Sequence, residues 1–227
     1  MPILEASDGN LRWQRARLSK VNPGWAFVVR LQIPIFPLGT VLYPGGRLPL
    51  RIFEPRYVAM TRRCLAEDAV FGVSLILDGQ EVGAPAVPHA VGCSARIVDS
   101  TVLEADMFAL LAIGESAFRI QRRETQADGL ILAEVEWLAG PAPMPVPSEY
   151  APLVQLLRQA VEQMGEGELV PPLRYNDSAW VARRLAERLP MPVAARQRIL
   201  ECADPLQQLS VVAGALAALG AGSGRAG

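Results

Sequence analysis

Lysine is almost absent from this sequence. Lys20 is the single lysine among 227 residues, whereas arginine occurs 21 times. A phosphate-binding loop, a Schiff-base enzyme and a Ser–Lys dyad each need a lysine within the folded body of the chain. These three kinds of active site are therefore excluded from the residues that follow Lys20.

Histidine and cysteine are nearly as scarce. His89 is the one histidine, and the three cysteines, Cys64, Cys93 and Cys202, lie far apart without any C-x-x-C pair. A zinc site needs several clustered histidines or cysteines, and a disulfide framework needs an even number of cysteines. We therefore predict no metal, no cofactor and reduced thiols, which are typical of an intracellular protein.

Neither charge nor hydrophobicity favours a nucleic acid or a membrane as partner. The net charge is −1 and the pI of the sequence is about 5.9, which argues against a broad basic surface for phosphate backbones. The longest uncharged apolar stretch, 211–222, is too short to span a bilayer. Glu5 and Asp8 precede any apolar run, so the first residues do not resemble a signal peptide. We therefore expect a cytoplasmic protein that binds neither nucleic acid nor a membrane.

The region from 31 to 140 is typical of a β domain, because short apolar runs alternate with glycine and proline. Seven runs are long enough to form strands: Ile33–Leu38, Leu48–Ile52, Val70–Leu77, Val91–Val98, Met107–Ile113, Phe118–Arg122 and Leu130–Trp137. Short strands at this spacing indicate an antiparallel barrel or sandwich. One helix interrupts them. It begins at Glu54-Pro55, since proline is favoured at the first helical position, and it ends near Asp68.

A proline-rich connector follows this β domain. Its sequence, PAPMPVPS, is typical of a stiff and extended chain. Beyond it, apolar residues recur at spacings of three and four, which predicts three or four helices packed as a small bundle. The predicted organisation is an N-terminal extension, a β domain, a linker, a helical bundle and a tail, at residues 1–30, 31–140, 141–148, 149–220 and 221–227.

No catalytic motif in the sequence is complete. The segments around Ser74 and Ser94 lack the second glycine of the G-x-S-x-G nucleophile turn. A small hydrolase would have to combine a serine or cysteine with His89, and this alternative stays open. The other interpretation makes His89 an exposed loop residue and Cys93 a small core residue. Paired arginines are interpreted as solvated surface and lie at 62–63, 122–123 and 183–184.

One long stretch carries a family resemblance. It reads IPIFPLGTVLYPGGRLPLRIFEPRY from Ile33 to Tyr57. The sequence resembles the amino-terminal substrate-binding domain of Lon protease, and more closely the short stand-alone proteins built from that domain. Further similar segments follow in order, namely FGVSLI at 71–76, VGCSARI at 91–97, IGESAFRI at 113–120, AWVARRL at 179–185 and RQRILE at 196–201.

The resemblance implies both a fold and a role. The implied fold is α+β, with an antiparallel β pseudo-barrel of the PUA-like type, one inserted helix and a C-terminal α-helical bundle. The implied role is a non-catalytic module that recognises unfolded or apolar polypeptide segments, as an adaptor in protein quality control beside a protease or chaperone. Lon protease also carries an ATPase and a Ser–Lys peptidase, which the lysine count excludes here. RNA binding, by analogy with the PUA-like fold alone, is a further alternative.

Phe53, Glu54, Arg56 and Tyr57 are the candidate peptide-binding residues. They mark a turn from a strand into a helix, and aromatic and arginine side chains beside an exposed strand edge are frequent anchors for an extended peptide. The alternative is a structural corner, in which Glu54 caps the helix and pairs with Arg56 while Phe53 and Tyr57 fill the core. The sequence leaves both interpretations open.

Overall fold

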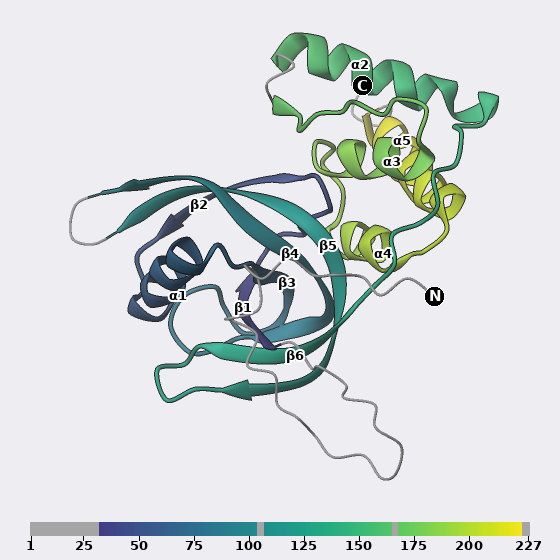
Figure 1. Ribbon diagram of the computed structural model, residues 1–227. Coiled ribbons are helices and arrows are strands. Elements are labelled where there is room, and N and C mark those ends of the chain that lie inside the picture. The colour runs from purple at the N-terminus through teal and green to yellow at the C-terminus, as the bar shows by residue number, and fades with distance from the viewer. Residues whose placement is uncertain (1–31, 104–106, 165–167, 224–227) are drawn as a thin grey trace, which may run out of the picture.

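The computed structural model describes residues 32–103, 107–164 and 168–223 (Figure 1). Its elements follow one another as β1 (Gln32–Leu38), β2 (Arg47–Ile52), α1 (Pro55–Glu67), β3 (Phe71–Asp78), β4 (Val87–Val102), β5 (Phe108–Thr125), β6 (Ile131–Trp137), the 3-10 turn η2 (Ser148–Tyr150), α2 (Ala151–Met164), α3 (Ser178–Ala186), α4 (Val193–Glu201) and α5 (Pro205–Ser223). The predicted extension, 1–30, lies outside the described residues. The predicted tail is partly helical, because α5 continues to Ser223.

The described strands form one sheet in the order β2-β5-β4-β3-β1-β6. The last strand, β6, also pairs with β5, so the hydrogen-bonded pairing returns to a strand already in the sheet (Figure 1). Strand β5 is long enough for this, since β2 pairs with its first half and β6 with its second half. The α+β class predicted from the sequence is confirmed, whereas its assignment to the PUA-like type stays a prediction.

The predicted antiparallel sheet is wrong at one pair of strands. Strands β1 and β3 run parallel, in a register that joins Ile35 to Gly72 and Leu38 to Leu75. The chain leaves β1, forms β2 and α1, and only then enters β3. This long connection lets the chain cross over and return in its original direction, which a tight hairpin turn does not allow.

The sequence also predicts two strands where the structure has one. The runs at 107–113 and 118–122 both belong to β5, which continues through Gly114. A Cβ atom at position 114 would overlap the carbonyl oxygen of Tyr43. The backbones meet here directly, because the amide of Gly45 donates to the Gly114 carbonyl at 2.7 Å. Glycine at this position therefore permits close approach and does not interrupt the strand.

Helix α1 covers part of the sheet and supplies apolar residues to the main core. Pro55 occupies its first turn, and Asp68 ends it with a left-handed φ of 47°, as the sequence predicts for the two ends. Tyr57, Met60 and Cys64 lie on its buried face. Spacings of three and four residues bring these side chains to one side of the helix.

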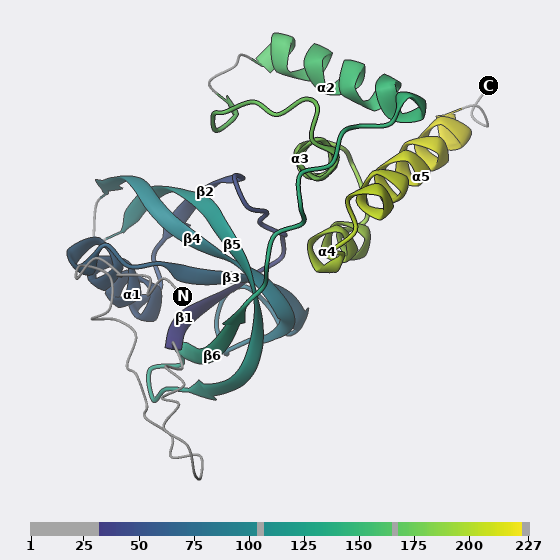
Figure 2. The ribbon, with the colours of Figure 1, turned by 45° about the vertical axis from the view of Figure 1, so that its right-hand side comes forward.

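Helices α2 to α5 gather beyond one end of the strands, with α3 packed against α5 (Figure 2). The Asp177 carboxylate accepts hydrogen bonds from the amides of Ala179 and Trp180 and thereby caps the N-terminus of α3. The outer part of α5 extends away from the other helices (Figure 2). A compact helical bundle stays a prediction. None of the helices in the described ranges is long and apolar enough to cross a membrane.

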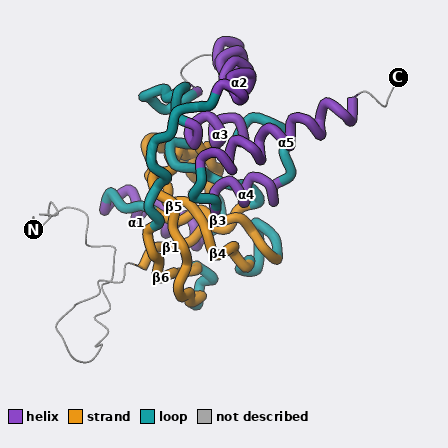
Figure 3. The backbone as a smooth tube through the Cα atoms, turned by 90° about the vertical axis from the view of Figure 1, so that its right-hand side faces the viewer, coloured by secondary structure: helices purple, strands orange, loops and turns teal. Residues whose placement is uncertain are grey.

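The helices are joined to the strands by buried polar contacts, and α4 lies next to β4 (Figure 3). The hydroxyl of Tyr43 donates to the Arg196 carbonyl at 2.8 Å, and the Gln197 amide donates to the Val91 carbonyl at 3.0 Å. One apolar core includes side chains from both sides of residues 141–148. The strands and the helices therefore share an interior, and the domain limits drawn from the sequence stay predictions.

Candidate functional site

The four residues predicted to bind peptide come together at the start of α1. Glu54 pairs with Arg56 at 2.8 Å, and the Arg56 guanidinium lies 4.8 Å from the centre of the Tyr57 ring. The Tyr57 ring packs on Phe36, with 4.1 Å between the ring centres. Phe53 precedes this cluster at the end of β2. The turn therefore forms an ordered corner of the fold.

Exposure separates these residues. Phe53 is 51% exposed, whereas Arg56 is 7% and Tyr57 is 4% exposed. Burial raises the pKa of the Tyr57 hydroxyl, as expected for a ring removed from water. Glu54 stands at the N-cap of α1, but its side chain makes no capping hydrogen bond. Phe53 is consequently the apolar side chain of the four that a partner can reach.

The strand that leads to Phe53 has an unpaired edge. Strand β2 stands at the end of the sheet order and pairs only with β5 among the described strands. The amide of Gly114 donates to the Gly46 carbonyl, and antiparallel ladders alternate between bonded and non-bonded pairs. By this alternation Arg47, Pro49 and Arg51 direct their backbone groups away from β5. Pro49 lacks an amide hydrogen, so it offers only its carbonyl, whereas Arg51 offers both an amide donor and a carbonyl acceptor.

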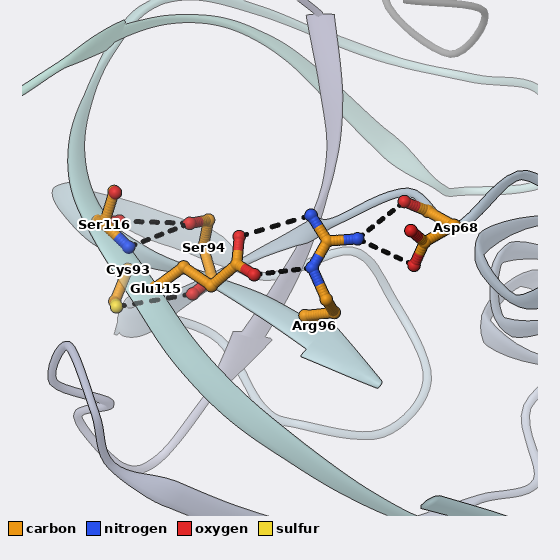
Figure 4. A network of polar contacts seen from close by, with 6 residues as sticks. All are labelled: Asp68, Cys93, Ser94, Arg96, Glu115 and Ser116. Atoms are coloured by element: carbon orange, nitrogen blue, oxygen red, sulfur yellow. Dashed lines mark hydrogen bonds and ion pairs between the residues drawn. The ribbon is translucent and has the colours of Figure 1, made fainter. Parts of the chain in front are cut away.

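A first pocket, of about 330 Å³, opens beside the start of β1. Arg96 lies on its wall and donates to Asp68 on one side and to Glu115 on the other (Figure 4). Glu115 and Asp68 raise the pKa of Arg96, with the Glu115 hydrogen bond as the main cause. The hydroxyl of Ser94 is also bonded to the Ser116 backbone. Arg96, Glu115 and Ser94 of this pocket thus already have polar partners within the fold.

A second pocket, of about 370 Å³, is lined by residues of β5 and of the link between α4 and α5. Arg119 of β5 and Arg183 of α3 both line it.

The sequence interpretation of Arg183 and Arg184 as solvated surface is wrong for Arg184, which is 2% exposed. The segments that cover Arg184 are distant from it in the chain, so no local pattern in the sequence marks Arg184 as buried.

The residues of the hydrolase alternative are dispersed. His89 lies 4.0 Å from Glu201, and the Ser74 hydroxyl donates to the His89 backbone carbonyl, not to its ring. Cys93 is fully buried, and burial raises the pKa of its thiol, which disfavours the reactive thiolate. Within the described ranges, no three acidic, histidine or cysteine side chains gather as metal ligands.

Sequence comparison relates the chain to a known domain. A family model described as the ATP-dependent protease La (LON) substrate-binding domain matches residues 32–218. Lon protease 2 of Myxococcus xanthus is 26% identical over 189 residues, which cover 79% of this chain and 23% of that protein. Protein cereblon of Xenopus tropicalis is 32% identical over 111 residues, covering 47% of this chain and 24% of its own. The chain thus spans about a quarter of the length of these relatives.

Solved structures give the same relation. The Lon N-terminal domain protein from Xanthomonas campestris matches with a TM-score of 0.67 and 33% identity, over 81% of this chain and 97% of that one. The N-terminal domain of a Mycobacterium avium complex Lon protease matches with a TM-score of 0.56 and 14% identity, over 80% and 95% of the two chains. The second match is a likeness of fold alone.

Proposed function

The chain belongs to the family of the ATP-dependent protease La (LON) substrate-binding domain, and from this premise we propose that it recognises polypeptides and does not cut them. The observation that carries the proposal is the extent of the family match, which takes in nearly every described residue, 32–218. We further propose an adaptor role in protein quality control, in which bound chains are passed to a separate protease or chaperone. The RNA-binding alternative rests on fold analogy and stays a prediction.

The β2 edge and Phe53 are the proposed contact for an extended segment. A segment laid along β2 would receive a hydrogen bond from the outward amide of Arg51 and donate to the outward carbonyls of Pro49 and Arg51, as in strand addition. Phe53 follows at the end of this edge with half of its surface exposed. An apolar side chain of the segment would cover it there. Glu54, Arg56 and Tyr57 then serve to hold the corner that presents Phe53.

We expect Phe53→Ala to weaken the binding of an unfolded chain about tenfold, because truncation of an aromatic anchor removes most of its contact area. The probe is reduced and carboxymethylated α-lactalbumin with a fluorescent label, titrated with the full protein. Anisotropy gives the Kd. Since Phe53 is half exposed, the free energy of unfolding should change little.

Val193→Ala is the matched control, because Val193 on α4 is 42% exposed and lies far along the chain from the corner. This variant should bind the unfolded probe as the wild type does. Equal weakening by both variants would argue for a diffuse apolar surface. No retention of the probe by the wild-type protein would overturn the proposed function itself.

A further inference from the structure

The second pocket joins three parts of the chain that are distant in sequence. Its walls come from β5, from the segment after β6, and from the link between α4 and α5. At about 370 Å³ it falls within the range of about 300–1,000 Å³ that is usual for ligand pockets. Its apolar wall includes Ala117, Leu138, Leu200 and Ala203. The pocket can therefore enclose a small apolar group.

Arg183 brings an unpaired cation to this pocket. Its Nε atom is buried without a hydrogen-bond partner, and no ion pair to its guanidinium is formed within the described residues. Burial is the main cause that lowers the pKa of Arg183, yet a guanidinium stays protonated in proteins. Arg183 as a whole is half-buried. A partly desolvated charge without an ion-pair partner is unfavourable, so an anion that entered the pocket would reduce that cost.

The nearby acidic groups are already engaged. Glu115, on the same pocket wall, binds the Arg96 guanidinium through both of its carboxylate oxygens. Glu201, also on the wall, accepts a hydrogen bond from the neutral Gln197 amide and keeps its negative charge. Asp177 attracts Arg183 electrostatically, but its carboxylate accepts the hydrogen bonds that cap α3. None of these groups makes an ion pair with Arg183.

The adjacent Arg184 also has a buried Nε without a partner, but its two terminal nitrogens are both bonded. It donates to the carbonyls of Pro44 and Gly45 and pairs with Glu187 at 2.8 Å. Helix α3 thus carries Arg184, which bonds to the loop before β2, and Arg183, whose guanidinium forms no ion pair within the described residues. The contrast indicates that Arg183 is available for a ligand.

We infer that this pocket binds the C-terminal carboxylate of a polypeptide, with the last side chain against the apolar wall. A planar guanidinium matches a carboxylate in shape and charge, and Arg119 adds a second cation to the lining. A chain end joins a carboxylate to an apolar side chain in one residue, which suits a pocket that offers both surfaces. Capture of terminal carboxylates is a recurring mode of peptide recognition. The inference rests on the proposed function, since it names which part of a polypeptide is recognised.

Three labelled octapeptides test it against the full protein by fluorescence anisotropy. The first ends in Ala-Leu with a free carboxylate, the second is the same peptide with a C-terminal amide, and the third carries an internal aspartate before an amidated end. The free acid should bind about tenfold more tightly than the amide, as expected for the loss of a charge-assisted hydrogen bond. If the internal aspartate restores full affinity, the pocket reads any carboxylate and the C-terminal assignment is wrong.

Arg183→Met should bind the acid and the amide alike, at the weaker affinity, because methionine keeps most of the stem length and removes the charge. Arg122→Met is the matched control, since Arg122 is an exposed arginine on the same strand as part of the wall but outside the lining. It should keep the tenfold preference. A preference that survives in Arg183→Met, or is missing from the wild type, overturns the inference.

The two proposals fail in different ways. Retention of unfolded α-lactalbumin with equal binding of acid and amide would remove the pocket inference and leave polypeptide recognition standing. A clear preference for the acid peptide without retention of unfolded α-lactalbumin would support the pocket inference and contradict the proposed recognition of unfolded chains.

Discussion

Replacing Arg184 by methionine should lower the free energy of unfolding by about 3–5 kcal/mol, the range that follows when one partner of a buried ion pair is removed. The Arg184 side chain is 2% exposed and donates to the carbonyls of Pro44 and Gly45. Methionine would leave both carbonyls without this donor. It would also leave Glu187 with Arg188 as its remaining ion-pair partner, at 3.2 Å.

Urea unfolding of the variant and the wild type measures this loss, and its pH dependence identifies the cause. Burial raises the pKa of Glu187 above its ordinary 4.5, and Arg184 opposes that rise. Without Arg184 the folded state would hold the proton still more tightly than the unfolded chain does. The deficit should therefore grow as pH rises through the folded pKa and shrink as pH falls toward 4.5.

Arg183→Met, one position away on the same helix, is the control for this experiment. It should leave the free energy of unfolding unchanged or higher, because it removes a half-buried charge that has no ion-pair partner among the described residues. Equal losses in the two variants would contradict the different roles assigned to Arg183 and Arg184.

Tyr57→Ala should cost about 3–5 kcal/mol of stability, as large aromatic truncations in a core do. The Tyr57 ring is 4% exposed and packs between Phe36 and the Arg56 guanidinium. Its removal would leave a cavity beneath the corner that presents Phe53. Weaker peptide binding by this variant would then reflect a disturbed corner, not the loss of a direct contact.

Tyr57→Phe keeps the ring and removes only the hydroxyl. It should change the free energy of unfolding by less than about 1.5 kcal/mol, the usual limit for one neutral hydrogen bond. Thermal and urea unfolding of the two variants separate packing from polar contacts. A stable Tyr57→Ala protein with reduced peptide affinity would return Tyr57 to the group of direct binding residues.

Local elements of this fold are predictable because their signals are local. Pro55 marks the first turn of α1, and Asp177, a residue type favoured at helix N-caps, directly precedes α3 and caps it. Glycine is harder to interpret. Gly114 suggests a break between two strands, whereas it lies inside β5 because a distant backbone segment at Tyr43 approaches it closely. The same residue type signals a turn or a contact, and only the folded chain distinguishes them.

Pairing and burial depend on segments far apart in sequence. The parallel partnership of β1 and β3 follows from a crossover, which no apolar pattern within either strand encodes. Arg183 and Arg184 are adjacent residues of the same type. The carbonyls of Pro44 and Gly45 accept hydrogen bonds from Arg184 and not from Arg183. At the corner proposed to bind peptide, the sequence predicts the turn but not which of its four residues are exposed. Phe53 precedes the helix, so the helical spacing of apolar residues does not predict whether its side chain is buried against the sheet or exposed to solvent.

The contacts that join strands to helices also set an order of events during synthesis. Tyr43, Pro44 and Gly45 find their partners on Arg184 and Arg196, which are made 139–153 residues later. At about 5–20 residues per second, the early loop would wait roughly 7–30 s on the ribosome with its carbonyls and ring uncovered. A chain stalled before α3 would lack both Arg184 and Arg196 and would leave this loop uncovered. A protein proposed to bind other unfolded chains would then itself expose an unfolded segment.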